Sequence, residues 1–152
     1  MKIAIGSDHA GFDLKEYLKG YLEKKGHTLI DVGTYERKSV NYVDYALKVA
    51  EMVASGGAEK GILICGTGIG MCIAANKVRG IRAALVHSLY TARMAALHNN
   101  ANVITMGGRI ETPEEAAEFV DTWLTTPFEG GRHEERLNKI KEYEKSIKEK
   151  EK

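Results

Sequence analysis

A cysteine followed by alternating glycines is the part of this sequence best suited to chemistry. Residues 62–71 read Ile-Leu-Ile-Cys-Gly-Thr-Gly-Ile-Gly-Met, so an aliphatic run ends at Cys65. We interpret this run as a buried strand that leads through a loop of bare backbone into a helix. The N–H groups of such a turn bind anions, and the same surroundings stabilise a thiolate. Cys65 is therefore a candidate nucleophile or general base.

The glycine spacing of this loop limits what it can hold. A dinucleotide fingerprint reads G-x-G-x-x-G, whereas Gly66, Gly68 and Gly70 alternate and Met71 occupies the place of the final glycine. The sequence has no Walker motif either, because Lys77 is too far from the loop. The loop therefore favours a phosphate or an oxyanion over a nucleotide, unless its glycines only form a tight turn.

Reactive side chains also follow other aliphatic runs. Asp8 and His9 follow the first run, where they could form an acid–base pair or hold a substrate. Asp8 could instead cap the helix that comes next. Arg109 follows a later run. Because ligands of open parallel sheets bind beyond the carboxyl ends of the strands, we expect these residues to lie near Cys65.

Two arginines near the C-terminus form a second basic group. Arg132 and Arg136 are four residues apart, so they share one face of the last predicted helix near its start. Such a pair suits a phosphate or a carboxylate. The alternative is that the two guanidinium groups only pair with neighbours such as Glu129 and Glu135.

His98 and Asn99 pose a geometric problem. They follow a predicted helix and precede a strand, so they should lie at the amino end of the sheet, opposite the glycine loop. Within one subunit they should not reach Cys65. They are therefore either structural or part of the site of a neighbouring subunit, which would make the protein an oligomer with shared sites.

Aliphatic runs alternate with amphipathic segments along the whole chain. We expect strands at residues 2–6, 28–32, 60–65, 81–86 and 102–106, and helices at 12–25, 42–54, 69–77, 88–97, 112–124 and 132–150. Ser88 and Thr112 are expected helix N-caps. This alternation predicts an α/β fold, with a five-stranded parallel sheet covered by helices on both faces and an extra C-terminal helix.

Composition narrows the class of protein. The 152 residues carry a net charge of +1, which gives no global attraction to nucleic acid or membranes. We expect one domain over residues 1–152, with neither a signal peptide nor a membrane span. The two cysteines do not suggest a disulfide and fit the cytoplasm. The charged helix at about 133–150 has a narrow apolar stripe, which indicates either a surface helix or a subunit interface.

Six motifs in one order resemble a known family. They begin at Gly6-Ser7-Asp8-His9-Ala10-Gly11 and include the Cys65 loop, Ile73-Ala74-Ala75-Asn76-Lys77, Gly80-Ile81-Arg82-Ala83, His98-Asn99 and Gly130-Gly131-Arg132-His133. Together they resemble the B-type ribose-5-phosphate isomerases, a group that also includes allose-6-phosphate and galactose-6-phosphate isomerases. The likeness spans about residues 2–140.

The resemblance implies a three-layer Rossmann-like sandwich, dimeric or tetrameric, with neither metal nor cofactor. It implies interconversion of D-ribose 5-phosphate and D-ribulose 5-phosphate through a cis-enediolate, with Cys65 as the base. Some members carry a glutamate base at the position of Met71, so the methionine here leaves the role to Cys65.

The resemblance also assigns the remaining residues. The N–H groups of Gly66, Gly68 and Gly70 would stabilise the oxyanion, and Thr67 and Asp8 would lie near the sugar oxygens. His98 would open the furanose ring and, with Asn99, would come from the adjacent subunit. The phosphate ligands would be His9, Arg109, Arg132 and Arg136. Two alternatives stay open: a hexose-6-phosphate isomerase of the same family, and a non-catalytic phosphate- or nucleotide-binding module.

Overall fold

Five parallel strands form a single sheet in the order β2-β1-β3-β5-β4. The computed structural model describes residues 1–151. The strands are β1 (Lys2–Ser7), β2 (Thr28–Asp31), β3 (Lys60–Cys65), β4 (Ala83–Leu85) and β5 (Val103–Gly107). The central strand β3 is buried from Gly61 to Cys65, because helices cover both of its faces. Its register with β5 places Cys65 beside Gly107.

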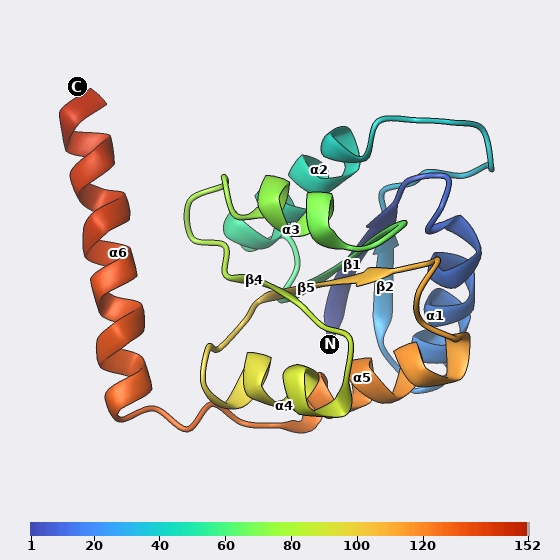
Figure 1. The fold of residues 1–152 in the computed structure, drawn as a ribbon. Helices are drawn as coiled ribbons and strands as arrows, with labels where there is room; N and C mark the ends of the chain where they lie inside the picture. Colours follow the sequence, from blue (N-terminus) through green and yellow to red (C-terminus); the bar gives the residue numbers. More distant parts are fainter. Residues whose placement is uncertain (152) are drawn as a thin grey trace.

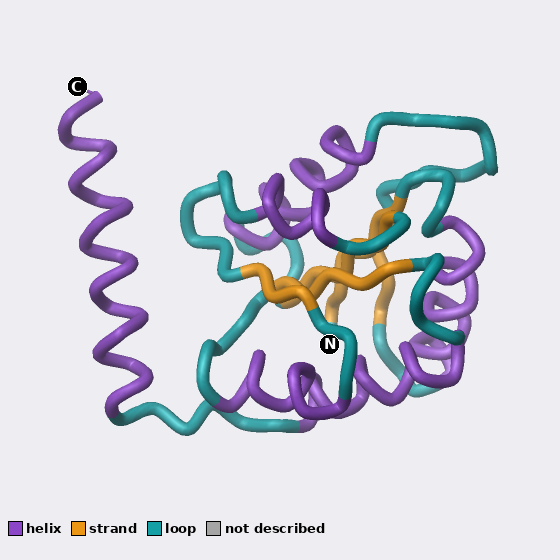
Figure 2. The backbone as a smooth tube through the Cα atoms, in the orientation of Figure 1, coloured by secondary structure: helices purple, strands orange, loops and turns teal. Residues whose placement is uncertain are grey.

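Helices cover both faces of the sheet (Figure 1). One face carries α2 (Tyr42–Ala54) and α3 (Ile69–Ala75), and the other carries α1 (Phe12–Lys24), α4 (Leu89–Leu97) and α5 (Pro113–Thr125). Figure 2 shows the orange sheet between these purple layers. The three-layer α/β/α sandwich expected from the sequence is therefore confirmed.

Each face of the sheet has its own apolar core. Ile5 and Ile62 pack toward α1, α4 and α5, whereas Ala4 and Leu63 pack toward α2 and α3. The alternation follows from the pleat, which turns successive side chains to opposite faces. Trp123 is 1% exposed in the first core, and its indole N–H donates to the carbonyl of Ala101 over 3.0 Å. This bond joins α5 to the segment that enters β5.

Local signals set several element ends correctly, but one strand is shorter than expected. Ser88 and Thr112 cap α4 and α5, each accepting a backbone N–H three residues ahead. The strand predicted at 81–86 is observed only at Ala83–Leu85. The N–H of Arg82 donates to the side chain of Asn102 over 2.8 Å, so a side chain replaces the strand partner before Ala83.

The C-terminal helix α6 (Arg132–Glu151) stands beside the body of the molecule (Figure 1). Leu137 is buried, but Ile140 and Tyr143 are 53% and 65% exposed. Glu144 holds the helix to the turn before β4, because it accepts hydrogen bonds from Arg79 and Gly80, each at 3.0 Å. Within residues 1–151, none of the helices combines the length and apolar character needed to cross a membrane.

Candidate active site

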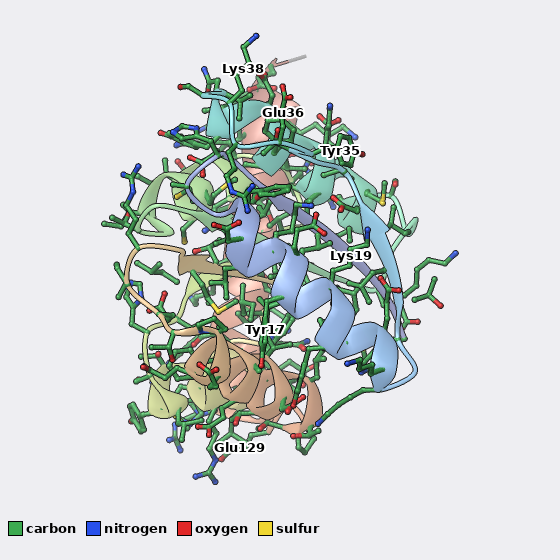
Figure 3. All side chains as sticks on the ribbon, turned by 90° about the vertical axis from the view of Figure 1, so that its right-hand side faces the viewer. Tyr17, Lys19, Tyr35, Glu36, Lys38 and Glu129 are labelled. Carbon is green, nitrogen blue, oxygen red and sulfur yellow. The ribbon has the colours of Figure 1, made fainter. Side chains whose placement is uncertain are left out.

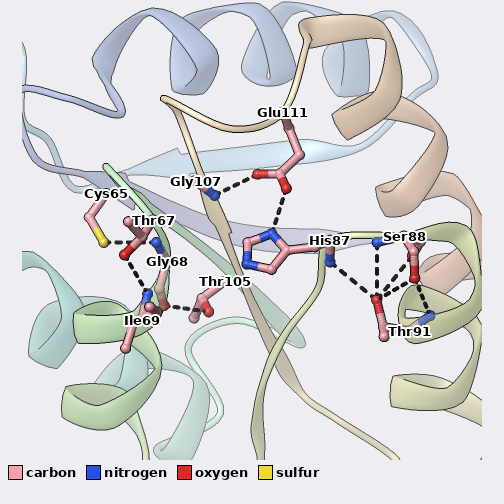
Figure 4. A network of polar contacts seen from close by, with 10 residues as sticks. All are labelled: Cys65, Thr67, Gly68, Ile69, His87, Ser88, Thr91, Thr105, Gly107 and Glu111. Carbon is pink, nitrogen blue, oxygen red and sulfur yellow. Dashed lines mark hydrogen bonds and ion pairs between the residues drawn. The ribbon is translucent and has the colours of Figure 1, made fainter.

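The loop after β3 fixes the sulfur of Cys65. Cys65 is 5% exposed, and its Sγ accepts the N–H of Gly68 over 3.1 Å. Thr67 turns its hydroxyl oxygen toward the N–H of Ile69, 3.2 Å away, at the start of α3 (Figure 4). The sulfur is therefore held by a backbone donor of its own loop. The predicted strand–loop–helix around Cys65 is thus observed.

Glycine is required in this loop for two different reasons. Gly68 has φ +84°, and a Cβ there would lie 2.7 Å from Leu85 and 2.8 Å from the backbone of Met106. Gly70 does not have a positive φ, but a Cβ added there would lie 2.4–2.7 Å from atoms of the Tyr42 side chain. The loop is therefore clamped between the sheet and Tyr42.

Tyr42 is a site residue that the sequence analysis missed. It begins α2 and lies over Gly70, with 37% of its surface exposed. Its ring forms an aromatic wall next to the glycine loop. An aromatic residue at the start of a helix, one position after the N-cap Asn41, was the available signal, but it is too common to identify a site.

Asp8 and His9 lie beside the Cys65 loop, as expected. Asp8 is 6% exposed and its backbone N–H donates to Ile64 in β3 over 3.2 Å. One carboxylate oxygen accepts the N–H groups of Ala10 and Gly11. The alternative role as a helix cap is wrong, because Gly11 is the N-cap of α1 and that cap has no side-chain hydrogen bond.

The imidazole of His9 is oriented by the loop that follows β2. Its Nδ1 accepts the N–H of Val40 over 3.2 Å, which leaves the proton on Nε2. A neutral His9 can therefore donate one hydrogen bond to a ligand through Nε2.

Arg109 also lies at this edge of the sheet. The N–H of Gly108 donates to the carbonyl of Cys65 over 2.7 Å, and that of Arg109 donates to the carbonyl of Gly66 over 3.1 Å. The exposed guanidinium lies over Gly66, since a Cβ there would be 3.2 Å from Nη1. A cation thus stands beside the thiol loop, where it can bind an anion.

A histidine–carboxylate pair adjoins the same edge (Figure 4). Nδ1 of His87 lies 2.5 Å from Glu111, whose other oxygen accepts the N–H of Gly107 over 2.7 Å. The Glu111 side chain is 2% exposed, whereas that of His87 is 37% exposed. The sequence analysis assigned no role to this pair, because its members are 24 residues apart and only the fold brings them together.

The other predicted residues gather elsewhere. His98 ends α4, and its ring stacks on His133 with centroids 4.0 Å apart. Asn99 follows it, and Arg132 and Arg136 are exposed on the first turns of α6. In Figure 3, the nearby Glu129 lies at the opposite end of the molecule from Glu36 and Lys38. The sequence analysis gave His133 no role and named Glu129 only as a possible partner of the two arginines.

The sheet register gives the separation of the two groups. Cys65 lies level with Gly107 at the carboxyl end of β5, whereas His98 precedes β5, which begins at Val103. At about 3.3 Å per residue, the two ends of β5 are about 13 Å apart. The prediction that His98 does not reach Cys65 within one subunit agrees with this geometry.

Two titratable groups near these regions have shifted pKa values. Burial lowers the pKa of His133, and the neighbouring His98 and Arg132 lower it further. Burial raises the pKa of the Cys72 thiol, which lies 3.5 Å from the carbonyl oxygen of Ala83. Both groups are therefore favoured in their neutral forms at neutral pH.

Comparisons with known proteins agree on one family. A family model described as Ribose/Galactose Isomerase matches residues 3–140. Ribose-5-phosphate isomerase B of Escherichia coli is 45% identical over 139 residues, covering 91% of this chain and 93% of the relative. A D-erythrulose-4-phosphate isomerase of Pectobacterium atrosepticum is 47% identical over 146 residues, covering 95% of each.

Solved structures resemble this one over nearly the whole chain. Clostridium thermocellum ribose-5-phosphate isomerase B has a TM-score of 0.95 and 52% identity, covering 97% of this chain and 99% of that one. The Mycoplasma genitalium enzyme with bound ribulose-5-phosphate has a TM-score of 0.91 and 45% identity, covering 95% and 96%.

Proposed function

The chain belongs to the ribose/galactose isomerase family, and we propose that it interconverts D-ribose 5-phosphate and D-ribulose 5-phosphate. The observation that carries this proposal is the M. genitalium relative, which matches 95% of the chain and holds ribulose-5-phosphate. The loop chemistry agrees with an aldose–ketose isomerase, because a thiol and backbone N–H groups lie on one loop and the guanidinium of Arg109 lies over that loop.

The proposed reaction moves one proton between C2 and C1 of the open-chain sugar. Cys65, as thiolate, removes the proton from C2 of the aldose; the C2–H electron pair forms the C1–C2 double bond, and a pair of the C1 carbonyl moves to O1. The thiol then gives its proton to C1 while the O2 proton passes to O1, so that C2 becomes the carbonyl of the ketose. N–H groups of Gly66 and Gly70 would hold the developing oxyanion, and each such donor contributes about 3–4 kcal/mol in comparable sites.

Ring opening precedes this step, since the substrate is a furanose. We assign it to His98 of a neighbouring subunit, with Thr67 and Asp8 exchanging protons with the sugar hydroxyls. Asn99 would bind a sugar oxygen next to His98. A histidine side chain is suited to this role because its ordinary pKa is near neutral pH, so that it can both give and take a proton.

The phosphate of the sugar would bind between residues of the two chains. His9 and Arg109 come from the chain that supplies Cys65, whereas Arg132 and Arg136 lie with His98. Guanidinium groups bind phosphate oxygens in pairs, so they can anchor the end of the sugar far from C1 and C2. That binding energy would align C2 against the sulfur of Cys65.

This assignment requires two chains, which agrees with the expected homodimer or tetramer with shared sites. A groove of about 720 Å³ lies between α6 and the open edge of β4, lined by Ile81, Ala84, Ile140, Tyr143 and Ile147. Asn99 also lines this groove, whereas Cys65 does not. We assign the groove to a second copy of the chain, which would cover the exposed stripe of α6 and bring His98 to a partner's Cys65.

A substrate panel tests the proposed function. The protein is incubated with the phosphates of ribose, allose, galactose and erythrulose and with free ribose, and aldose–ketose conversion is followed by NMR. We expect the highest kcat/KM with ribose 5-phosphate and none with free ribose. Preference for a hexose 6-phosphate would select the alternative within the family, and binding without turnover would select the non-catalytic module.

A further inference from the structure

Three side chains with metal-binding atoms meet where α4 and α6 approach each other. Nε2 of His98 lies 3.7 Å from a carboxylate oxygen of Glu129, and Nε2 of His133 lies 4.0 Å from the same oxygen. All three atoms lie within 4.8 Å of one another. The two imidazoles thus face one carboxylate from the same side.

The backbone holds these side chains in place. His98 is the C-cap of α4, with its N–H donating to Met94 over 2.9 Å. The N–H of Glu129 donates to the carbonyl of Leu97 over 2.9 Å, which ties the segment before α6 to the end of α4. His133 is in the first turn of α6, four residues after Glu129. The group is therefore set by two elements that are hydrogen-bonded to each other.

His133 gives an independent indication of a ligand. It is 7% exposed, and within residues 1–151 its Nε2 is buried and has no hydrogen-bond partner. A buried polar atom without a partner is rare, because it has lost its hydrogen bonds to water and has formed no other hydrogen bond in their place.

We propose that His98, Glu129 and His133 bind a divalent transition metal ion of the Zn²⁺ type. Two imidazoles and one carboxylate form a common ligand set for such ions, with a water molecule in the fourth position. The two rings are stacked with an interplanar angle of 11°. Because a metal ion lies in the plane of each imidazole that binds it, binding requires the rings to leave the stack and rotate until both Nε2 lone pairs point at the ion. Arg132 and Arg136 oppose the charge of the ion, but both are exposed and water screens them.

Metal binding at this place would inhibit the isomerase. The ion would occupy the Nε2 lone pair of His98, which then could no longer exchange a proton with the sugar ring. This second step rests on the proposed function of His98, whereas the binding step does not. The two steps can therefore be tested separately.

Binding is measured with the full-length protein, by calorimetry with Zn²⁺ and by absorption with Co²⁺. We expect one equivalent per chain and the visible d–d bands of a four-coordinate Co²⁺ site. Glu129→Gln and His133→Gln should each weaken binding by at least about tenfold, because each removes a ligand. His27→Gln is the matched control, since Nδ1 of His27 is also buried without a partner but belongs to no such group.

Three results would overturn the site: no binding by the wild-type protein, unchanged affinity in both ligand variants, or a Co²⁺–thiolate charge-transfer band that places the metal on a cysteine. Inhibition is measured as the rate with Zn²⁺ relative to each variant's own rate in chelator. Loss of inhibition in Glu129→Gln supports the inhibitory step. One-equivalent binding with an unchanged wild-type rate overturns that step and leaves the metal site standing.

Discussion

The amide of Gly68 donates its hydrogen to the sulfur of Cys65 over 3.1 Å. Gly68 also has φ +84°, a dihedral that residues with a Cβ rarely adopt, and this dihedral turns the chain into α3 directly after the donor. One glycine therefore both bonds the thiol and makes the turn into the helix. This relationship makes the loop testable by substitutions at either end.

Replacing Cys65 with alanine should abolish the proton transfer while leaving the fold intact. We expect kcat to fall at least ~100-fold, the usual scale for a general base, with an unchanged melting temperature. Cys72→Ser is the control, because burial raises the pKa of Cys72 and its thiol contacts the carbonyl of Ala83 and the amide of Asn76. The control should keep the wild-type rate. Full turnover by Cys65→Ala would remove Cys65 from the reaction.

Replacing Gly68 with alanine should cost both stability and activity. The left-handed dihedral alone costs about 1–2 kcal/mol, and the new Cβ would also press on Leu85 and Met106. Gly26→Ala is the matched control, since Gly26 has φ +93° but nothing within 4 Å of a Cβ. Urea unfolding and kcat are measured for both variants. Equal losses of stability in the two would show that the contacts around Gly68 do not matter.

Mixing inactive subunits tests whether the site is shared. We expect Cys65→Ala and His98→Ala to be inactive alone and to recover about a quarter of the wild-type rate after exchange, because half of the dimers then hold one intact site of two. Subunit exchange is verified by native mass spectrometry. If exchange occurs without recovery, both residues serve the same chain's site and the shared arrangement is wrong.

Acid should weaken the fold through Asp31. Its pKa is lowered: burial alone would raise it, but hydrogen bonds from Lys15, Gly33 and Lys19 outweigh burial. A carboxylate with a lowered pKa stabilises the fold above its ordinary value near 4, and this stabilisation is lost as the pH falls through the lower, folded value. Asp31→Asn should thus flatten the loss of stability below about pH 4.

The same substitution should also destabilise the protein at neutral pH. Lys15 is fully buried and lies 2.6 Å from Asp31, so removing the carboxylate leaves a buried ammonium with only Glu16. The expected loss is about 3 kcal/mol in the free energy of unfolding. Asp13→Asn serves as the control, because its ion pair with Arg37 is exposed and should contribute little. An unchanged acid slope in Asp31→Asn would assign the pH dependence to other carboxylates.

Local chemistry explains what could be predicted of the fold. Ser88 and Thr112 were predictable as caps because a hydroxyl three residues before a backbone N–H acts within one turn. The start of β4 at Ala83, two residues later than expected, was not predictable in this way. It depends on the Asn102 side chain, 20 residues from Arg82, and on Asn76, whose amide binds both backbone groups of Ala83.

The same division holds for the candidate site. The Cys65 loop was predictable because its strand, thiol and glycines are contiguous in sequence. The remote position of His98 also followed from topology, since a residue between a helix and the next parallel strand lies at the amino edge. Tyr42 over Gly70 and Glu111 on His87 were missed, because each contact joins separate elements and has no local signature.

Cys65 and His98 lie toward opposite ends of the strands, so a site that needs both also makes activity depend on dilution. In the proposed assembly, one chain supplies the thiol and its partner supplies the ring-opening histidine. The turnover per chain would then fall as the protein concentration drops below the dissociation constant of the dimer. The concentration of the protein in the cell would therefore set both the amount of enzyme and the fraction of chains that are assembled into active dimers.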